Sequence, residues 1–125
     1  MSEKNKKILI IDDDDILCSM YKTKMENDGF KVFTANNGTD GLKLAREEKP
    51  DLILLDVIMP QIDGFAVLED LKKDDKTKDI SVIMLTNLGT DEDKEKGEKM
   101  GAIDYFVKAD LTPTQISAKI KRMLK

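Results

Sequence analysis

Three continuous apolar runs of strand length recur along this chain and limit the folds that it can adopt. The runs cover residues 7–11, 52–55 and 81–85. Strands that are apolar on both faces belong inside a parallel sheet that helices cover on both sides. Weaker strand patterns lie at residues 31–35 and 103–107, so the chain is predicted to form five strands.

Helical patterns fill the segments between these strands. Gly29 ends the first helix, and the second opens at Asn36-Asn37-Gly38 and ends near Glu48, because Pro50 follows. Apolar side chains recur at helical spacing in the first and third helices, at Ile16, Leu17, Met20, Tyr21 and Met25 and at Phe65, Leu68 and Leu71.

The last two helices differ in their start signals and composition. Residues 91–100 are almost all charged and include Gly97, so this helix is predicted to be the weakest and most mobile. The final helix starts well, because Thr112, Pro113 and Gln115 occupy the cap, first-turn and capping-box positions. Its predicted buried stripe consists of Ile116, Ile120, Met123 and Leu124.

Five strand–helix pairs in 125 residues predict one α/β domain. The expected architecture is a flavodoxin-like, doubly wound five-stranded parallel sheet with strand order 2-1-3-4-5 and helices on both faces. This single domain would span residues 1–125, and we expect no effector domain in this chain.

Composition narrows the classes of function. A net charge of −4, from 21 Lys and Arg against 25 Asp and Glu, argues against direct nucleic-acid binding. No apolar run is long enough to cross a membrane, and the polar residues 1–7 do not resemble a signal peptide. Cys18 is the single cysteine, so we expect a small buried side chain in a reducing, cytoplasmic setting.

The chain contains no histidine. Chemistry must therefore come from carboxylates, hydroxyls and lysines, and hard oxygen ligands favour Mg²⁺ or a similar cation. In open parallel sheets, ligands bind beyond the carboxyl ends of the strands. The side chains expected there are Asp12 to Asp15, Asp56, Thr86, Asn87 and Lys108.

An Asp run after a strand is often only a helix cap and a solvated turn, and Asp14 or Asp15 is expected to be such a cap. Three crowded carboxylates repel one another, so either some of them take up protons or a cation joins them. A lysine and a threonine hydroxyl beside such a cation would suit a phosphoryl group in transfer, with Asp56 as nucleophile.

Four motifs then stand out in order along the chain: Ile10-Ile11-Asp12-Asp13, Leu54 to Pro60 followed by Asp63-Gly64, Leu85-Thr86, and Gly101 to Lys108. Together they resemble the receiver domains of bacterial-type two-component response regulators, over nearly the whole chain. The resemblance implies a signalling phosphoacceptor rather than an enzyme. Such a protein assists its own phosphoryl transfer and is slowly dephosphorylated.

The resemblance also implies residue roles. Asp56 would be the phosphoacceptor and a ligand of Mg²⁺ (or Mn²⁺). Asp13 would bind the metal directly, Asp12 would bind it through water, and Ile58 would offer its backbone carbonyl. Thr86 and Lys108 would be the catalytic groups that bind the phosphoryl oxygens.

Tyr105 matches an aromatic switch position whose rotamer follows Thr86, although its spacing alone predicts an ordinary strand aromatic. The fourth helix, fifth strand and fifth helix would form the readout face. A histidine kinase or phosphotransfer protein would supply the phosphoryl group, and a downstream protein or effector domain would receive the signal. The chain would be a monomer or a phosphorylation-dependent dimer, either stand-alone or part of a longer regulator.

The sequence departs from the family pattern at two positions. Ala109 follows Lys108 where the family has a proline after a cis peptide, so either a cis bond costs about 2.5–4 kcal/mol or the peptide is trans and Lys108 is placed differently. Asn87 replaces a small residue after Thr86 and narrows access to the site. Ile58 and Leu88 are apolar and cannot orient water, which predicts slow self-dephosphorylation.

Two other functions remain open. A pseudo-receiver, an interaction module with this fold that is never phosphorylated, would not need the full set of site residues. A Mg²⁺-dependent phosphohydrolase of the haloacid-dehalogenase type would want a second acid where Ile58 stands.

Overall fold

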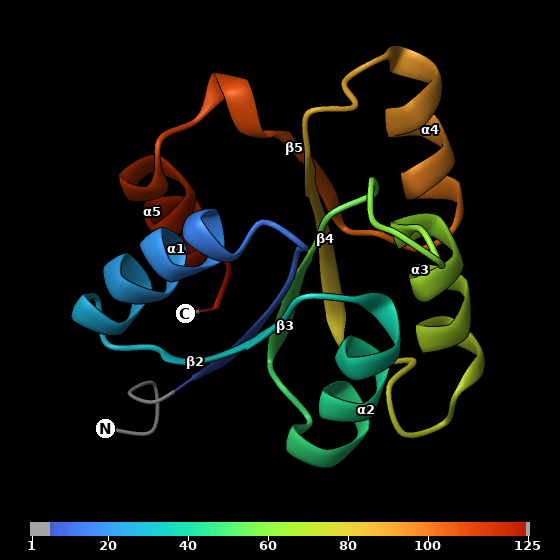
Figure 1. Ribbon diagram of the computed structural model, residues 1–125, viewed down its shortest axis with the longest axis horizontal. Coiled ribbons are helices and arrows are strands. Elements are labelled where there is room, and N and C mark those ends of the chain that lie inside the picture. Colours follow the sequence, from blue (N-terminus) through green and yellow to red (C-terminus); the bar gives the residue numbers. More distant parts are fainter. Residues whose placement is uncertain (1–5, 125) are drawn as a thin grey trace.

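A computed structural model describes residues 6–124 of the protein. All the strands are parallel and form one five-stranded sheet in the order β2-β1-β3-β4-β5 (Figure 1). The predicted strand order is therefore confirmed. The strands are β1 (Lys7–Ile11), β2 (Lys31–Ala35), β3 (Leu52–Leu55), β4 (Ser81–Thr86) and β5 (Asp104–Val107).

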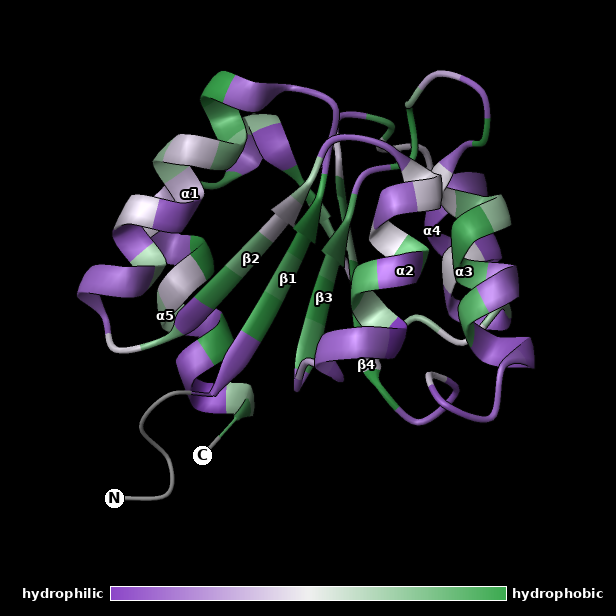
Figure 2. Ribbon diagram, turned by 60° about the horizontal axis from the view of Figure 1, so that its bottom comes forward, coloured by the Kyte–Doolittle hydropathy of each residue, from purple (hydrophilic) through white to green (hydrophobic). Residues whose placement is uncertain are grey.

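Helices cover both faces of the sheet, as predicted. One face carries α1 and α5, and the other carries α2, α3 and α4 (Figures 1 and 2). The helices are α1 (Asp15–Asn27), α2 (Gly38–Glu48), α3 (Gly64–Lys73), α4 (Asp91–Lys99) and α5 (Pro113–Met123). A short 3₁₀ helix, η1 (Lys108–Asp110), follows β5 and was not expected from the sequence.

Alternate side chains of each central strand enter two separate cores. In β1, Leu9 and Ile11 pack toward α2 and α3, whereas Ile8 and Ile10 pack toward α1 and α5. All four are at most 1% exposed. Figure 2 shows the central strands as the most hydrophobic part of the chain. The strand runs are continuous in hydrophobicity because both faces of the sheet are covered.

Each α-helix begins at a side-chain cap. Asp14 accepts a hydrogen bond from the Leu17 amide at 3.0 Å, so the first helix uses Asp14 rather than Asp15 as its cap. The predicted capping box of α5 is present, with Thr112 and Gln115 each accepting from the other's backbone amide at 3.1 and 2.8 Å. These caps fix the points at which the chain leaves the edge of the sheet.

One residue of the predicted buried stripe of α5 is exposed. Met123, the last residue of the helix, is 40% exposed, whereas Leu124, which follows the helix, packs partly buried against the core. In α1, two of the apolar residues that recur at helical spacing, Ile16 and Met20, are 77% and 52% exposed, whereas Cys18 is buried in the core as expected. Of the polar run at residues 1–7, residues 1–5 lie outside the described part of the chain. Between residues 6 and 124, no helix combines the length and apolarity that a membrane crossing requires.

Candidate functional site

The structure brings the predicted site residues together at the carboxyl edge of the sheet. Asp12 follows β1, Asp56 follows β3, Thr86 ends β4, and Lys108 follows β5. Backbone hydrogen bonds hold both acids in line with the sheet, from the Asp12 amide to the Ala35 carbonyl at 3.0 Å and from the Asp56 amide to the Ile11 carbonyl at 2.9 Å.

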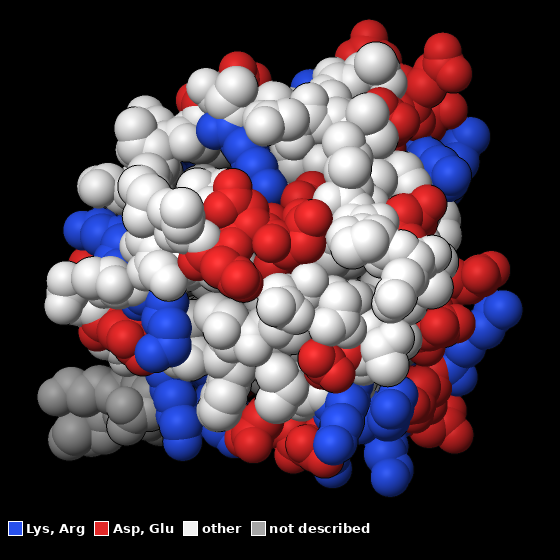
Figure 3. Space-filling model, viewed as in Figure 1, with Lys and Arg blue, Asp and Glu red and all other residues white. Residues whose placement is uncertain are grey.

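Three carboxylates form the centre of this site. One oxygen from each of Asp12, Asp13 and Asp56 lies within 4.8 Å of the others. Asp12 and Asp56 are only 2% and 6% exposed, whereas Asp13 is exposed. Figure 3 shows a compact acidic group over the ends of β1 and β3, with a basic side chain beside it. The acids can therefore meet a ligand from solvent on one side only.

Lys108 bridges two of these acids. Its Nζ atom lies 2.6 Å from Asp12 Oδ2 and 3.0 Å from Asp56 Oδ2. Burial alone would lower the pKa of Lys108, but the hydrogen bonds to Asp12 and Asp56 outweigh it and raise that pKa. Burial, aided by the charge of Asp56, raises the pKa of Asp12 despite the bond from Lys108. Lys108 thus stays charged and neutralises only part of the acidic site.

The remaining predicted residues line the same edge. Thr86 is fully buried, and its Oγ1 accepts from the Leu88 amide at 3.4 Å. The Ile58 amide donates to Asp56 Oδ1 at 3.3 Å, while the Ile58 side chain is 58% exposed.

No cis peptide occurs within residues 6–124, so the bond between Lys108 and Ala109 is trans. Lys108 nevertheless reaches Asp12 and Asp56. Of the two arrangements that the sequence left open at Ala109, the structure has the trans peptide.

Gly64 sets the close approach of α3 to the phosphoacceptor candidate. A Cβ atom at this position would overlap the backbone oxygen of Asp56. The Gly64 amide also donates to the Val57 carbonyl at 2.8 Å. The start of α3 therefore packs directly against the backbone of Asp56 and Val57, and only glycine fits at this contact.

The donor set fits a hard divalent cation. Oxygens around an octahedral Mg²⁺ ion are about 3 Å apart when adjacent and about 4.2 Å apart when opposite, so three oxygens within 4.8 Å of one another can share one ion once they draw closer together. The charge of Asp56 contributes to the raised pKa of Asp12, and a cation between them would relieve that repulsion. Asp12, Asp13 and Asp56 are the residues that could hold the metal. The Ile58 carbonyl stays a predicted fourth ligand.

Tyr105 lies on β5 between this site and α4. Its hydroxyl donates to the Leu88 carbonyl, in the loop that follows Thr86. Burial, together with the charges of Asp93 and Asp56, raises the pKa of Tyr105 to about 12. A Cβ atom at Gly97 would lie 3.2 Å from the Tyr105 ring, so the glycine in α4 makes room for this ring. The residue that weakens α4 thereby also packs it against Tyr105.

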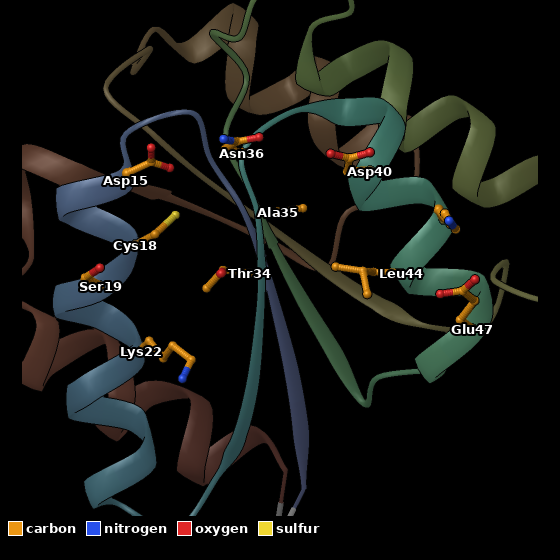
Figure 4. A pocket seen from close by; sticks show the side chains of 11 residues that line it. Asp15, Cys18, Ser19, Lys22, Thr34, Ala35, Asn36, Asp40, Leu44 and Glu47 are labelled. Carbon is orange, nitrogen blue, oxygen red and sulfur yellow. The ribbon is translucent and has the colours of Figure 1, made fainter.

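A groove of about 600 Å³ lies beside the carboxylates rather than over them. It runs between α1 and α2 along the edge strand β2, with Asp15, Lys22, Asp40 and Glu47 among its lining residues (Figure 4). Asp12, Asp13 and Asp56 do not line it. Its mixed charges and open edge distinguish it from the acidic site.

We expect Mg²⁺ to stabilise the protein through these acids. At a hundred times its dissociation constant, Mg²⁺ should add about 2.7 kcal/mol to the free energy of unfolding. Asp13→Asn removes a ligand charge and should raise the Mg²⁺ concentration needed by at least about tenfold. The measurement is thermal unfolding by circular dichroism across a magnesium titration.

Asp14→Asn is the matched control for this experiment. It removes one neighbouring negative charge, and asparagine can still cap α1 at that position. An equal loss of Mg²⁺ response in both variants would show only a general charge effect. No response in the unmodified protein would contradict the metal site.

The fold and the site together define an α/β protein with a lysine-bridged acidic pocket at the carboxyl edge of a doubly wound sheet. The chain belongs to the response regulator receiver domain family, whose family model matches residues 8–121. This family is that of the receiver domains of two-component systems, as the motifs indicated. Receiver domains bind Mg²⁺ at an acidic pocket, and the cluster of Asp12, Asp13 and Asp56 corresponds to such a pocket.

Three similar proteins illustrate the match. Protein PilH of Pseudomonas aeruginosa is 43% identical over 104 residues, which cover 82% of this chain and 84% of PilH. The DNA-binding dual master transcriptional regulator RpaA of Synechocystis is 40% identical over 119 residues, covering 95% of this chain and 49% of RpaA. The solved structure of chemotaxis protein CheY4 of Vibrio cholerae has a TM-score of 0.87 at 28% identity, covering 94% of this chain and 98% of CheY4.

The chain spans about half the length of several curated relatives, between 47% and 51% of four probable transcriptional regulators from algal sources. The part of each relative that matches is similar to the receiver domain found at residues 8–121 of this chain. Their names describe transcriptional regulators, and that activity belongs to the longer proteins.

Proposed function

We propose that this chain is a phosphorylation-dependent signalling switch that accepts a phosphoryl group on Asp56 from a histidine kinase or phosphotransfer protein. The observation that carries the proposal is the position of Lys108, bonded to both Asp12 and Asp56 within a cluster of three carboxylates. A structural surface site would not need a largely buried lysine, with a side chain only 12% exposed, to reach from one strand end to acids at two others.

The proposed chemistry is an in-line phosphoryl transfer. A carboxylate oxygen of Asp56 attacks the phosphorus atom while the bond from phosphorus to the donor nitrogen breaks. Lys108 and the hydroxyl of Thr86 bind phosphoryl oxygens and stabilise the charge that develops on them. Mg²⁺ held by Asp12, Asp13 and Asp56 would neutralise further charge on the phosphoryl group. Because the chain has no histidine, the donor is a separate protein or a small phosphodonor.

The proposal is tested with acetyl phosphate and read by intact-protein mass. The protein should gain the mass of one phosphoryl group in the presence of Mg²⁺ and gain none after divalent metals are chelated. If no gain occurs under either condition, the chain is a pseudo-receiver that acts by binding alone.

Output would follow from a change in population between two arrangements of the site loops. Contacts from Thr86 and Lys108 to the phosphoryl group would favour one arrangement, and Tyr105 would transmit it to α4. The proposed readout face consists of α4, β5 and α5, and it would bind a downstream protein or effector domain. The switch would act in the cytoplasm as a monomer or a phosphorylation-dependent dimer.

We expect the phosphorylated protein to lose its phosphoryl group slowly. Ile58 is 58% exposed beside Asp56, and Leu88 is half-buried beside Thr86, and neither side chain can orient an attacking water. Ile58→Asn, at this exposed position, should speed hydrolysis because an amide can hold that water. The measurement is the decay of the phosphorylated mass after the donor is removed. A half-life of only seconds in the unmodified protein would contradict the prediction.

A further inference from the structure

Two departures from the family pattern meet in the structure. Asn87 Oδ1 accepts a hydrogen bond from the Ala109 amide at 3.0 Å. Asn87 directly follows Thr86, and Ala109 directly follows Lys108. The contact therefore joins the two strand ends that carry the proposed phosphoryl-binding groups. A proline at residue 109 would have no N–H to donate.

The Ala109 amide needs such a partner. Ala109 lies in the first turn of η1, where backbone N–H groups have no acceptor within the helix. Val107 precedes η1 and provides no side-chain cap. Asn87 takes the place of a capping residue, but it reaches the helix from the neighbouring loop. The Lys108 carbonyl completes the turn by accepting from the Leu111 amide at 3.3 Å.

The loop after β4 contacts the β5 end at two further points. The Leu88 carbonyl accepts from the Tyr105 hydroxyl, and a Cβ atom at Gly89 would lie 3.0 Å from the Val107 side chain. Three consecutive residues, 87 to 89, thus contact β5 or η1. Only the Asn87 contact lies beyond the end of β5, next to Lys108.

We propose that Asn87 is a positioning residue, whose hydrogen bond to the Ala109 amide holds Lys108 and Thr86 in register for phosphoryl transfer. The Asn87 bond joins the loop after Thr86 to the loop after Lys108, next to a trans peptide between Lys108 and Ala109. The inference rests on the proposed phosphorylation of Asp56. From the sequence, Asn87 was expected only to narrow access to the site. Here it supports the position of Lys108 and Thr86 instead.

Two substitutions of similar volume distinguish a positioning role of Asn87 from an effect of its bulk on access to the site. Asn87→Leu keeps the bulk of the side chain and removes the acceptor, whereas Asn87→Asp keeps both. Asn87 is exposed, so neither change should prevent folding. With acetyl phosphate and Mg²⁺ at saturation, Asn87→Leu should slow phosphorylation by about three- to tenfold, the range for one lost hydrogen bond. Asn87→Asp should retain the saturated rate, with a weaker apparent affinity for the anionic donor because of its charge.

The dependence on the Ala109 amide is tested in a second background. Ala109→Pro removes the N–H, and Ala109→Gly is its control because glycine keeps the N–H. Asn87→Leu should slow phosphorylation in the Ala109→Gly background and have no further effect in the Ala109→Pro background. An equal effect in both backgrounds, or none in the otherwise unmodified protein, would overturn the proposal.

A readout that needs no phosphorylation tests the contact itself. Hydrogen exchange of the Ala109 amide, followed by NMR, should speed up in Asn87→Leu and not in Asn87→Asp. If the unmodified protein accepts no phosphoryl group, the proposed function fails, while the exchange result still reports on the contact. If phosphorylation proceeds and Asn87→Leu changes neither rate nor exchange, the function stands and the role of Asn87 falls.

Discussion

Replacing Asp56 with asparagine is expected to abolish phosphorylation completely. The amide has no anionic oxygen to attack phosphorus. Among residues 6–124, Asp12 is the only other buried acid bonded to Lys108, and it is held by shorter bonds than Asp56 is. Its two oxygens accept at 2.6 and 2.9 Å, against 3.0 and 3.3 Å for the oxygens of Asp56. Intact-protein mass after incubation with acetyl phosphate and Mg²⁺ gives the result. The fold should persist, because removing one of three crowded charges relieves repulsion.

Asp63→Asn is a matched control for this change. Asp63 caps α3 by accepting from the Ala66 amide at 2.9 Å, and asparagine can cap in the same way. That variant should be phosphorylated like the unmodified protein. A phosphoryl gain that survives Asp56→Asn would place the acceptor elsewhere and contradict the assignment of Asp56.

Replacing Lys108 with methionine should have the second largest effect. Methionine keeps much of the side-chain length but removes the charge that would meet the phosphoryl oxygens. Loss of one such donor typically slows the reaction by about a hundredfold or more. Mg²⁺ should bind more tightly to the variant, because Lys108 no longer occupies Asp12 and Asp56. The rate of mass gain and a magnesium titration measure these two effects.

The same variant should lose stability in the absence of metal. The side chains of Asp12 and Asp56 are only 3% and 7% exposed, and in this variant the two acids lose the cation that bridges them. A loss of about 1–3 kcal/mol at neutral pH is expected, since the open side of the site lets water solvate part of the charge. Chemical denaturation with and without Mg²⁺ measures it, and Mg²⁺ should restore the loss.

The loss of folding stability in Lys108→Met should also depend on pH. The pKa of Asp12 is raised in the folded protein above its ordinary value of 3.8, mainly by burial, and Lys108 counteracts that rise. The folded state therefore binds more protons than the unfolded state between those two values, and stability falls as pH rises through the window. In Lys108→Met, the difference between the folded and unfolded pKa of Asp12 should be larger, because Lys108 no longer lowers the folded pKa. Acidification from neutral pH should therefore recover more stability than in the unmodified protein. Stability that is unchanged by Lys108→Met would mean that the acids are already solvated.

Much of the fold follows from local patterns in the sequence. The continuous apolar runs predicted strands covered on both sides, and Thr112 with Gln115 predicted the start of the last helix. These predictions succeeded because strand burial and helix capping depend on residues close together in the chain. The exposure of Ile16 and Met123 could not be predicted in this way, because helical spacing does not say which apolar side chains reach the sheet.

The grouping of the site residues could also be predicted from the sequence, whereas their roles could not be established from it. Ligands bind at the carboxyl ends of parallel strands, and this rule groups Asp12, Asp56, Thr86 and Lys108 from the sequence alone. Their identity and order along the chain carry the resemblance to receiver domains. The roles of these residues remain predictions, which the phosphorylation and magnesium experiments test.

Only the tertiary structure decided how Lys108 is held. From the sequence, Ala109 left two arrangements possible, and Asn87 was expected only to narrow the site. The structure shows a trans peptide, a short 3₁₀ helix and a bond from the Ala109 amide to Asn87, 22 residues away in the chain. Local propensity determined the strands and helix starts, whereas the pairing of two distant loops depends on where the completed sheet places their ends.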